Sequence, residues 1–261
     1  FHVMAWGLPF AAPMAGAGLV LPGPRLDGAS LWALMEAEGV TAAAGVPTIW
    51  LGLLEEIRRR GRPPSGFRRT MVGGSAPSPA LIRAYEAAEV EFVHGWGMTE
   101  MSPVGTLGAL PPERDGDDLD ARVALKAKQG RPVFGVELAI RDEDGRDLPH
   151  DGAARGRLLA RGPWIASGYY RSEVSPLTED GWLDTGDVAT IDADAFVTIV
   201  DRAKDLVKSG GEWISSIDVE NAASTCPGVA LAAVIGLPHP KWDERPAIVV
   251  QPTAEDPADE A

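Results

Sequence analysis

Hydrophobic and polar positions in the first third of the chain follow the periods of alternating helices and strands. Two runs carry apolar residues at helical spacing after helix-start signals, residues 27–39 and 47–61. A third helix is expected at residues 79–88, and short apolar runs predict buried strands at 40–46, 70–72 and 90–93. Because strands and helices alternate, the pattern predicts an α/β fold with a parallel sheet covered by helices.

The pattern changes after a polar stretch at residues 111–120. From 131 to 201 apolar residues alternate with polar ones between turn signals, which predicts a small antiparallel β module. Beyond Lys204 come a loop with Gly210 and Gly211, a capped helix and two apolar strands, expected at 216–225, 230–236 and 248–250. We therefore expect an α/β part at 1–125, a β-rich part at 126–203 and a third part at 204–261.

The first 21 residues are uncharged and as long as a membrane span. Five glycines and prolines interrupt them, so a buried core segment is favoured over a membrane-inserted one. The segment has no basic region typical of a signal peptide, and the chain opens on Phe1 rather than Met. These features indicate a piece of a longer protein.

The charge balance of the chain limits the kinds of ligand that the protein is expected to bind. The chain has 261 residues, and 24 Lys and Arg stand against 38 Asp and Glu, a net charge of −14. A chain this acidic is not expected to bind nucleic acid, and any anion must be bound by local groups. The single cysteine, Cys226, excludes an internal disulfide and a cysteine-based zinc site and fits a cytoplasmic location.

A first glycine-bearing loop follows the strand expected at 70–72. It reads Gly73-Gly74-Ser75-Ala76 and precedes a helix, so a ligand phosphate could approach its backbone and the free N–H groups of that helix. A plain tight turn is the alternative, because these residues match neither the P-loop nor the dinucleotide pattern.

A second candidate, residues 94–100, follows the strand expected at 90–93, at the edge where open α/β sheets bind ligands. Trp96 can stack on a flat base, Thr99 offers a hydroxyl, and Glu100 offers a carboxylate suited to magnesium. These groups together suit a nucleotide phosphate. A solvated loop acid is the alternative for Glu100 alone.

A third candidate group lies between residues 185 and 213. Asp187 can accept two hydrogen bonds from a ribose diol, and Arg202 and Lys208 supply donors. Asp and Arg at strand ends are often structural. Their clustering at the boundary between the β module and the last region favours function.

These motifs occur in the order found in one enzyme family. The segments that carry the likeness are 1–9, 44–48, 72–76, 95–100, 162–165, 168–170, 181–187 and 201–214. With these segments the chain resembles the acyl-CoA synthetases of the adenylate-forming superfamily, and most of all the soluble bacterial fatty-acyl-CoA synthetases. The likeness spans almost the whole chain.

The resemblance implies a fold and a reaction. The fold would be the rear part of the large N-terminal adenylation domain, with its β-barrel subdomain, followed by the start of the small α+β C-terminal domain. The reaction would use ATP and Mg²⁺ to convert a carboxylic acid, such as a medium- or long-chain fatty acid, to an acyl-adenylate. Coenzyme A would then displace AMP and give acyl-CoA. A homodimer is implied by analogy only.

The resemblance also assigns roles to residues. Thr99 and Glu100 would be catalytic, with Glu100 as the magnesium ligand, and the remaining ATP and AMP contacts of this part would be Gly73, Gly74, Ser75, Ala76, His94, Gly95, Trp96, Gly97 and Met98. Asp187 would bind the ribose beside Arg202. Lys204 would be the hinge about which Lys208 and Trp213 approach the adenylate, and Val3 and Trp6 would border the acyl tunnel.

Two family features have no counterpart in the chain. The loop that grips the ATP β- and γ-phosphates would precede Phe1, and the lysine that orients the carboxylate would follow Ala261. The chain by itself is therefore expected to be catalytically defective. Two alternatives stay open: an adenylation enzyme that loads a carrier-protein thiol, and a nonenzymatic nucleotide-binding module.

Overall fold

The computed structural model describes residues 3–114, 116–210, 212–223 and 225–253, and the side chain of Val3 and residue Gly211 lie outside what it describes. The chain forms two compact units. The first contains residues 1–138, 160–183 and 192–198, and the second contains 139–159, 184–191 and 199–261.

A five-stranded sheet forms the centre of the first unit. Its strands lie in the order β1 (Ala42–Gly45), β2 (Arg69–Val72), β3 (Glu91–Gly97), β4 (Val104–Leu107) and β5 (Arg131–Pro132). β1, β2 and β3 run parallel, as predicted, whereas β4 and β5 add antiparallel pairs that the sequence did not indicate. The expectation that β3 ends at residue 93 is wrong, because pairing with β4 extends it to Gly97.

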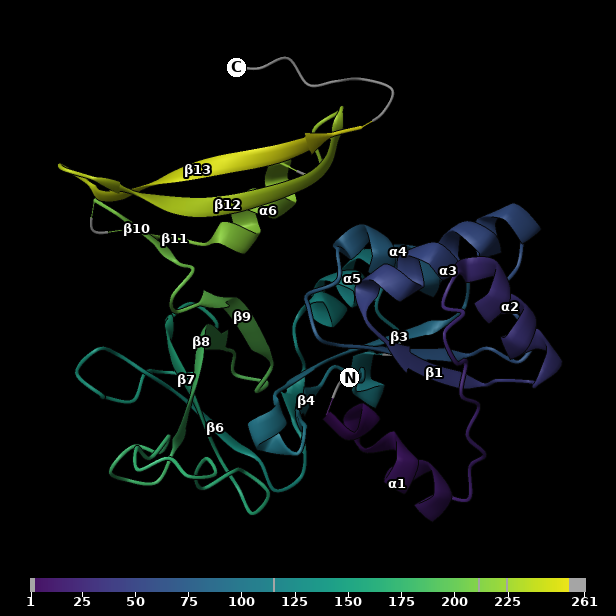
Figure 1. Cartoon of the computed structure of the whole chain (residues 1–261), viewed down its shortest axis with the longest axis horizontal. Coiled ribbons are helices and arrows are strands. Elements are labelled where there is room, and N and C mark those ends of the chain that lie inside the picture. Colours follow the sequence, from purple (N-terminus) through teal and green to yellow (C-terminus); the bar gives the residue numbers. More distant parts are fainter. Residues whose placement is uncertain (1–2, 115, 211, 224, 254–261) are drawn as a thin grey trace. The chain divides into compact units, whose positions relative to one another are not determined.

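The expected helices form close to their predicted positions. They are α2 (Gly28–Ala37), α3 (Pro47–Arg60) and α4 (Pro79–Ala87), with Asp27 and Ser78 accepting hydrogen bonds at two N-termini. A further helix, α5 (Leu119–Ala127), begins where only a polar stretch was expected. Short 3₁₀ turns complete the unit at Val3–Gly7, Thr99–Met101 and Pro112–Arg114. In Figure 1, α3 and α4 lie above β1 and β3.

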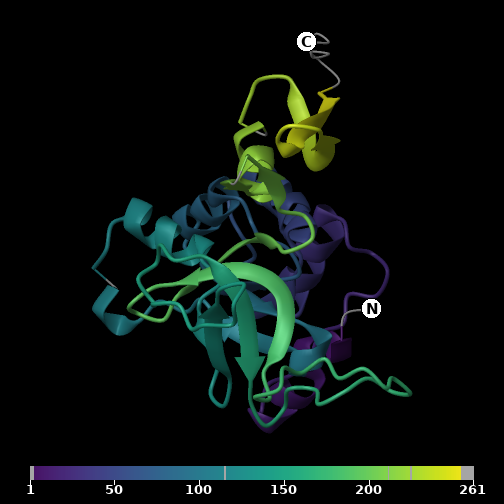
Figure 2. The ribbon, with the colours of Figure 1, turned by 90° about the vertical axis from the view of Figure 1, so that its left-hand side faces the viewer.

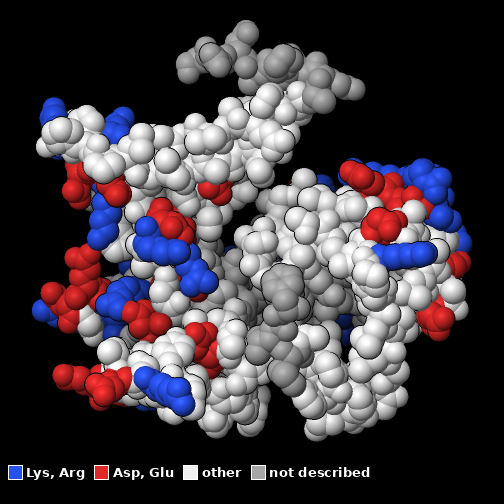
Figure 3. Space-filling model, viewed as in Figure 1, with Lys and Arg blue, Asp and Glu red and all other residues white. Residues whose placement is uncertain are grey.

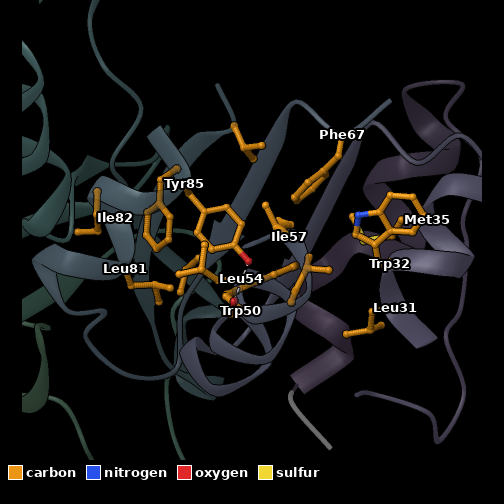
Figure 4. Packing of buried hydrophobic residues seen from close by; sticks show 14 of the residues in the cluster. Leu31, Trp32, Met35, Trp50, Leu54, Ile57, Phe67, Leu81, Ile82 and Tyr85 are labelled. Carbon is orange, nitrogen blue, oxygen red and sulfur yellow. Dashed lines mark hydrogen bonds between the residues drawn. The ribbon is translucent and has the colours of Figure 1, made fainter. Parts of the chain in front are cut away.

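Aromatic side chains organise the core between these helices and the sheet (Figure 4). Trp50 stacks on Phe67 with ring centroids 6.3 Å apart and meets Tyr85 edge-on. The buried hydroxyl of Tyr85 donates a hydrogen bond of 2.7 Å to the carbonyl oxygen of Trp50. This bond ties α4 to α3 inside the apolar core.

The apolar N-terminal segment is not part of that core, so the expectation of a buried segment is wrong. Its helix α1 (Leu8–Met14) contains no buried residue, and Phe10 and Met14 are 56% and 88% exposed. Glycines and prolines divide the segment into a 3₁₀ turn, one short helix and irregular chain, so it has no long apolar face that could pack against the sheet. None of the helices in the described residues is long and apolar enough to cross a membrane.

A four-stranded sheet runs through the region expected to be β-rich, in the order β6 (Glu137–Arg141), β7 (Gly156–Arg161), β8 (Leu183–Ile191) and β9 (Val197–Arg202). Its teal and green strands face the viewer in Figure 2. The region therefore has the predicted strand-and-turn character. The turn signal at Gly145 lies between β6 and β7, where the glycine has a φ of 79°.

The second unit also holds a small sheet with one helix. Strands β10 (Val207–Ser209), β11 (Glu212–Ile214), β12 (Val229–His239) and β13 (Asp243–Pro252) follow the order β11-β10-β13-β12, and α6 (Ser216–Ala223) packs on β12. Both β12 and β13 are longer than predicted, because they form one antiparallel hairpin. In Figure 3 the visible surface over β12 and β13 is mostly white, so few charged side chains lie on that face of the hairpin.

A buried cluster of charges joins α4, α5 and β3. The side chains of Glu86 and Lys126 are fully buried, and the Lys126 ammonium lies 2.8 Å from Glu86 Oε1. Glu86 also accepts hydrogen bonds from Arg122 and from the backbone N–H of Phe92, and Lys126 donates to the Phe92 carbonyl oxygen at 3.0 Å. Both buried charges are thus matched by partners of opposite sign or by backbone groups, as burial requires.

Replacing Lys126 with Met should destabilise the protein by about 3 kcal/mol, because it leaves the buried Glu86 carboxylate without its ammonium partner. Urea denaturation monitored by circular dichroism measures the change. The control is Arg83→Met, which breaks the exposed pair of Arg83 with Asp120 and should leave the free energy of unfolding nearly unchanged. Equal effects of the two substitutions would contradict the role given to the buried cluster.

Candidate active site

The glycine-rich segment after His94 is part of strand β3, not a loop beyond it. Gly95 and Trp96 pair with Leu107 and Thr106 of β4, and the register then shifts before Gly97 pairs with Val104. A methyl group added at Gly97 would lie 1.9 Å from the carbonyl oxygen of Pro103. Only glycine therefore allows the two backbones to approach here.

Thr99 and Glu100 follow β3 in the 3₁₀ turn Thr99–Met101. Thr99 is exposed, whereas Glu100 is half-buried and accepts a hydrogen bond of 2.7 Å from the Tyr169 hydroxyl. The backbone of Ala166 donates to the carbonyl oxygen of Glu100 at 2.7 Å. Side-chain and backbone contacts thus hold the carboxylate against the segment around residues 166–169.

Tyr169 has no assigned role in the sequence-based interpretation, although it lies within one of the recognised segments. Its hydrogen bond to Glu100 raises the pKa of the phenol above its ordinary value. The two residues are 69 positions apart, and no periodicity relates them. Their contact is seen only in the folded structure, where the segment between β7 and β8 returns to the turn that follows β3.

His94 points into the protein. The residue is 2% exposed, and its Nδ1 lies 3.2 Å from the carbonyl oxygen of Ala127 at the end of α5. Burial lowers the pKa of this histidine from 6.5 to about 4, although hydrogen bonds to the backbone of α5 partly oppose the shift. The imidazole is therefore neutral at neutral pH and connects β3 to α5.

The loop at Gly73–Ala76 follows β2, and Trp6 lies against its first residue. A methyl group added at Gly73 would lie 3.5 Å from Cη2 of the Trp6 indole. Gly74 has a φ of 85°, a left-handed conformation that favours glycine, and Gly74, Ser75 and Ala76 are exposed. The structure thus brings the predicted phosphate loop and one of the two predicted acyl-tunnel residues together.

Asp187 and Arg202 form an ion pair within the second unit. Arg202 Nε lies 3.0 Å from Asp187 Oδ1, and the guanidinium also donates to the carbonyl oxygen of Thr185 at 3.3 Å. The Asp187 side chain is 4% exposed, whereas half of the Arg202 side chain is open to solvent. Asp187 lies in the middle of β8 and Arg202 at the end of β9, and the two residues are neighbours, as the resemblance implied.

The predicted hinge and closure residues follow β9. Lys204 is exposed in the turn between β9 and β10. Lys208 on β10 pairs in register with Trp213 on β11, and its ammonium lies 5.2 Å from the centroid of the indole. The backbone N–H of Lys208 donates to Glu244 at 2.9 Å, so the hairpin β12–β13 holds this strand.

The family comparison decides the class of the protein. A model described as the AMP-binding enzyme matches residues 1–170, more than half of the chain. The chain belongs to the AMP-binding enzyme family. A second model, described as the AMP-binding enzyme C-terminal domain, matches residues 218–261.

Curated members of the family resemble the chain over its full length. It is 50% identical to the 3-methylmercaptopropionyl-CoA ligase of Ruegeria lacuscaerulensis over 99% of the chain and 48% of that protein. Identity to the medium-chain-fatty-acid–CoA ligase of Ectopseudomonas oleovorans is 50%, over 95% of the chain and 46% of the relative. Identity to the long-chain-fatty-acid–CoA ligase of Thermus thermophilus is 49%, over 100% of the chain and 49% of that protein. The chain spans about half the length of these relatives.

Solved structures show the same fold. The o-succinylbenzoate CoA synthetase of Bacillus subtilis in complex with its acyl-adenylate intermediate superposes with a TM-score of 0.80 at 27% identity. The match covers 96% of this chain and 50% of the other. The structure of the same synthetase with ATP and a magnesium ion gives a TM-score of 0.80 at 26% identity. This match covers 97% of the present chain and 50% of the synthetase. The predicted adenylate-forming fold is therefore confirmed.

The depressed pKa of His94 predicts a pH dependence of stability. The unfolded histidine binds a proton near pH 6.5 and the folded one only near pH 4, so this residue should lower the free energy of unfolding as the pH falls between those values. The slope is up to about 1.4 kcal/mol per pH unit. Urea denaturation of His94→Gln and the unsubstituted protein at several pH values should show a shallower loss for the variant. The exposed His150, replaced by Gln, is the control; a slope unchanged by His94→Gln would contradict the prediction.

Proposed function

We propose that the protein is part of an AMP-forming acyl-CoA synthetase. The observation that supports this most is the Thr99-Glu100 pair, held at the end of β3 beside Trp96 within a chain of the AMP-binding enzyme family. The relatives described above are all named as CoA ligases. Coenzyme A is therefore favoured over a carrier-protein thiol as the acyl acceptor.

The proposed nucleotide contacts come from separate segments of the chain. Trp96 would stack on the base, the backbone of Gly73–Ala76 and the segment 94–98 would line its site, and Thr99 would donate its hydroxyl to a phosphate oxygen. Asp187 would accept hydrogen bonds from the ribose hydroxyls, with Arg202 orienting its carboxylate. Within the segment 94–98, His94 would contribute through its backbone only, because its side chain is buried against α5.

The residues present fit a magnesium ion that is carried by ATP. Among the described residues no group of three or more His, Cys, Asp or Glu side chains could hold a metal by itself. Magnesium characteristically binds through one or two carboxylates together with substrate phosphates, and Glu100 supplies one such carboxylate. When bound, the ion would offset the negative charge that develops during phosphoryl transfer.

The chemistry has two steps. A carboxylate oxygen of the acid attacks the α-phosphorus of ATP, a P–O bond forms, and the bond to pyrophosphate breaks. The thiolate of coenzyme A then attacks the acyl carbon, and AMP leaves as the C–O bond breaks. Lys208 and Trp213 would meet the adenylate after movement about Lys204, where we place the domain boundary, with 1–203 and 204–261 on either side.

The acid is proposed to be a medium- or long-chain fatty acid, with a short thioether acid as the second candidate. Both classes occur in the names of relatives at nearly equal identity. Trp6, which lies against Gly73, and Val3 are proposed to border the acyl chain. A cytoplasmic location and a homodimer are carried over from the family as further parts of the proposal.

Replacing Glu100 with Gln should reduce acid-dependent exchange of pyrophosphate into ATP by about 100-fold or more, because the amide cannot offset the charge of the metal ion. The experiment uses the protein expressed from its complete gene, with Mg²⁺ varied. Glu113→Gln, at an exposed acid of the same unit, is the matched control. Normal exchange by the Glu100 variant would rule out the proposed metal role.

A panel of acids and acceptors tests the substrate assignment. Release of AMP should depend on both a fatty acid and coenzyme A, and the rates with medium-chain, long-chain and thioether acids should rank the candidates. AMP release that requires a carrier protein instead would favour the alternative acceptor. ATP binding without any acid-dependent exchange would favour the nonenzymatic module.

A further inference from the structure

Gly105 lies next to the Trp96 indole at the irregular point of the β3–β4 pair. Trp96 pairs with Thr106 and Gly97 with Val104, so Gly105 is the residue that the register shift skips. A methyl group added to Gly105 would lie 2.8 Å from Cζ3 and 2.9 Å from Cε3 of Trp96, and 2.8 Å from the sulfur of Met101. These separations are too short for real Cβ contacts, so any side chain at position 105 displaces a neighbour.

Hydrogen bonds oppose movement of the Gly105 backbone away from the indole. Its carbonyl oxygen accepts a hydrogen bond of 3.0 Å from the N–H of Val133 on the opposite side. The next residue, Thr106, is fully buried, and its hydroxyl donates to the carbonyl oxygen of Gln129. Bonds on the far side of β4 thus fix the strand against movement away from the indole.

The indole is the neighbour that would move. Met101 is fully buried, so its side chain has no open space to enter without displacing other core atoms. Trp96 is half-buried, and rotation toward solvent costs it less contact. The missing side chain at Gly105 therefore determines how closely the ring lies on β4.

We propose that Gly105 is a positioning residue for nucleotide binding, acting through the ring of Trp96. The inference rests on the proposed function, in which that ring stacks on the base. An added methyl group would tilt or lift the indole and misalign its face from the base without touching the nucleotide itself. The side chain allowed at position 105 and the size of the aromatic ring at position 96 are therefore coupled.

The first test measures AMP binding by calorimetry for the protein expressed from its complete gene. Gly105→Ala should weaken AMP binding about tenfold, equivalent to about 1.4 kcal/mol. The matched control is Gly116→Ala, at an exposed glycine with open space around its Cα and no left-handed φ, and it should bind AMP like the unsubstituted protein. Unchanged binding by the Gly105 variant would overturn the proposal.

The second test separates ring position from general damage to the strand. A tyrosine at position 96 lacks the fused ring edge that carries Cε3 and Cζ3, whereas the contact of the added methyl group with the Met101 sulfur is common to both backgrounds. Gly105→Ala should therefore weaken AMP binding clearly less in a Trp96→Tyr background than with Trp96 present. Equal losses from Gly105→Ala in both backgrounds would show that the indole is not the group affected, and would overturn the proposal.

Thermal unfolding measurements keep the proposal testable for variants that fold poorly. If Gly105→Ala prevents folding with Trp96 present but not with tyrosine at that position, the steric coupling is supported; failure to fold in both backgrounds overturns it. Absence of AMP binding by the unsubstituted protein would instead reject the proposed function. The failures of the two proposals are thus distinguishable.

Discussion

Strand β3 is the constraint on which the candidate site depends, because it pairs in parallel with one neighbouring strand and antiparallel with the other. Residues 91–94 run parallel to β2, and 95–97 run antiparallel to β4. The first pairing fixes where the parallel sheet ends. The second carries the chain further in extended form, so that the proposed site residues Thr99 and Glu100 follow directly after a strand held by pairing on both edges.

The far face of the same strand is held by α5. Lys126 bonds to the Phe92 carbonyl oxygen, and the ring of His94 lies within hydrogen-bond distance of the carbonyl oxygen of Ala127. Glu86 compensates the buried ammonium of Lys126 and binds the N–H of Phe92 as well. A neutral imidazole and a balanced charge pair are the forms in which titratable groups can be buried at low cost, and both immobilise β3.

The local pattern of the sequence predicted much of the fold. Apolar spacing and caps placed α2, α3 and α4 within a few residues, and the order of contiguous motifs indicated the family. Contacts between residues that are far apart in the sequence could not be predicted from it. The β4 pairing depends on Gly97 and on a register shift, the Tyr169–Glu100 bond joins distant segments, and α5 follows a stretch whose polar residues resemble a loop. Exposure of the N-terminal segment was also missed, because hydrophobicity alone does not supply a packing partner.

The strongly acidic composition limits the ways in which the proposed nucleotide could be bound. With a net charge of −14, the chain cannot attract a polyphosphate by its overall field. On the face shown in Figure 3, basic side chains stand beside acidic ones rather than forming a continuous basic surface. Within each unit the candidate carboxylate is engaged locally, Asp187 by Arg202 and Glu100 by Tyr169. Binding of a nucleotide would then rely on backbone N–H groups, aromatic stacking and a metal ion carried by the ligand, which are short-range contacts that tolerate an acidic surface.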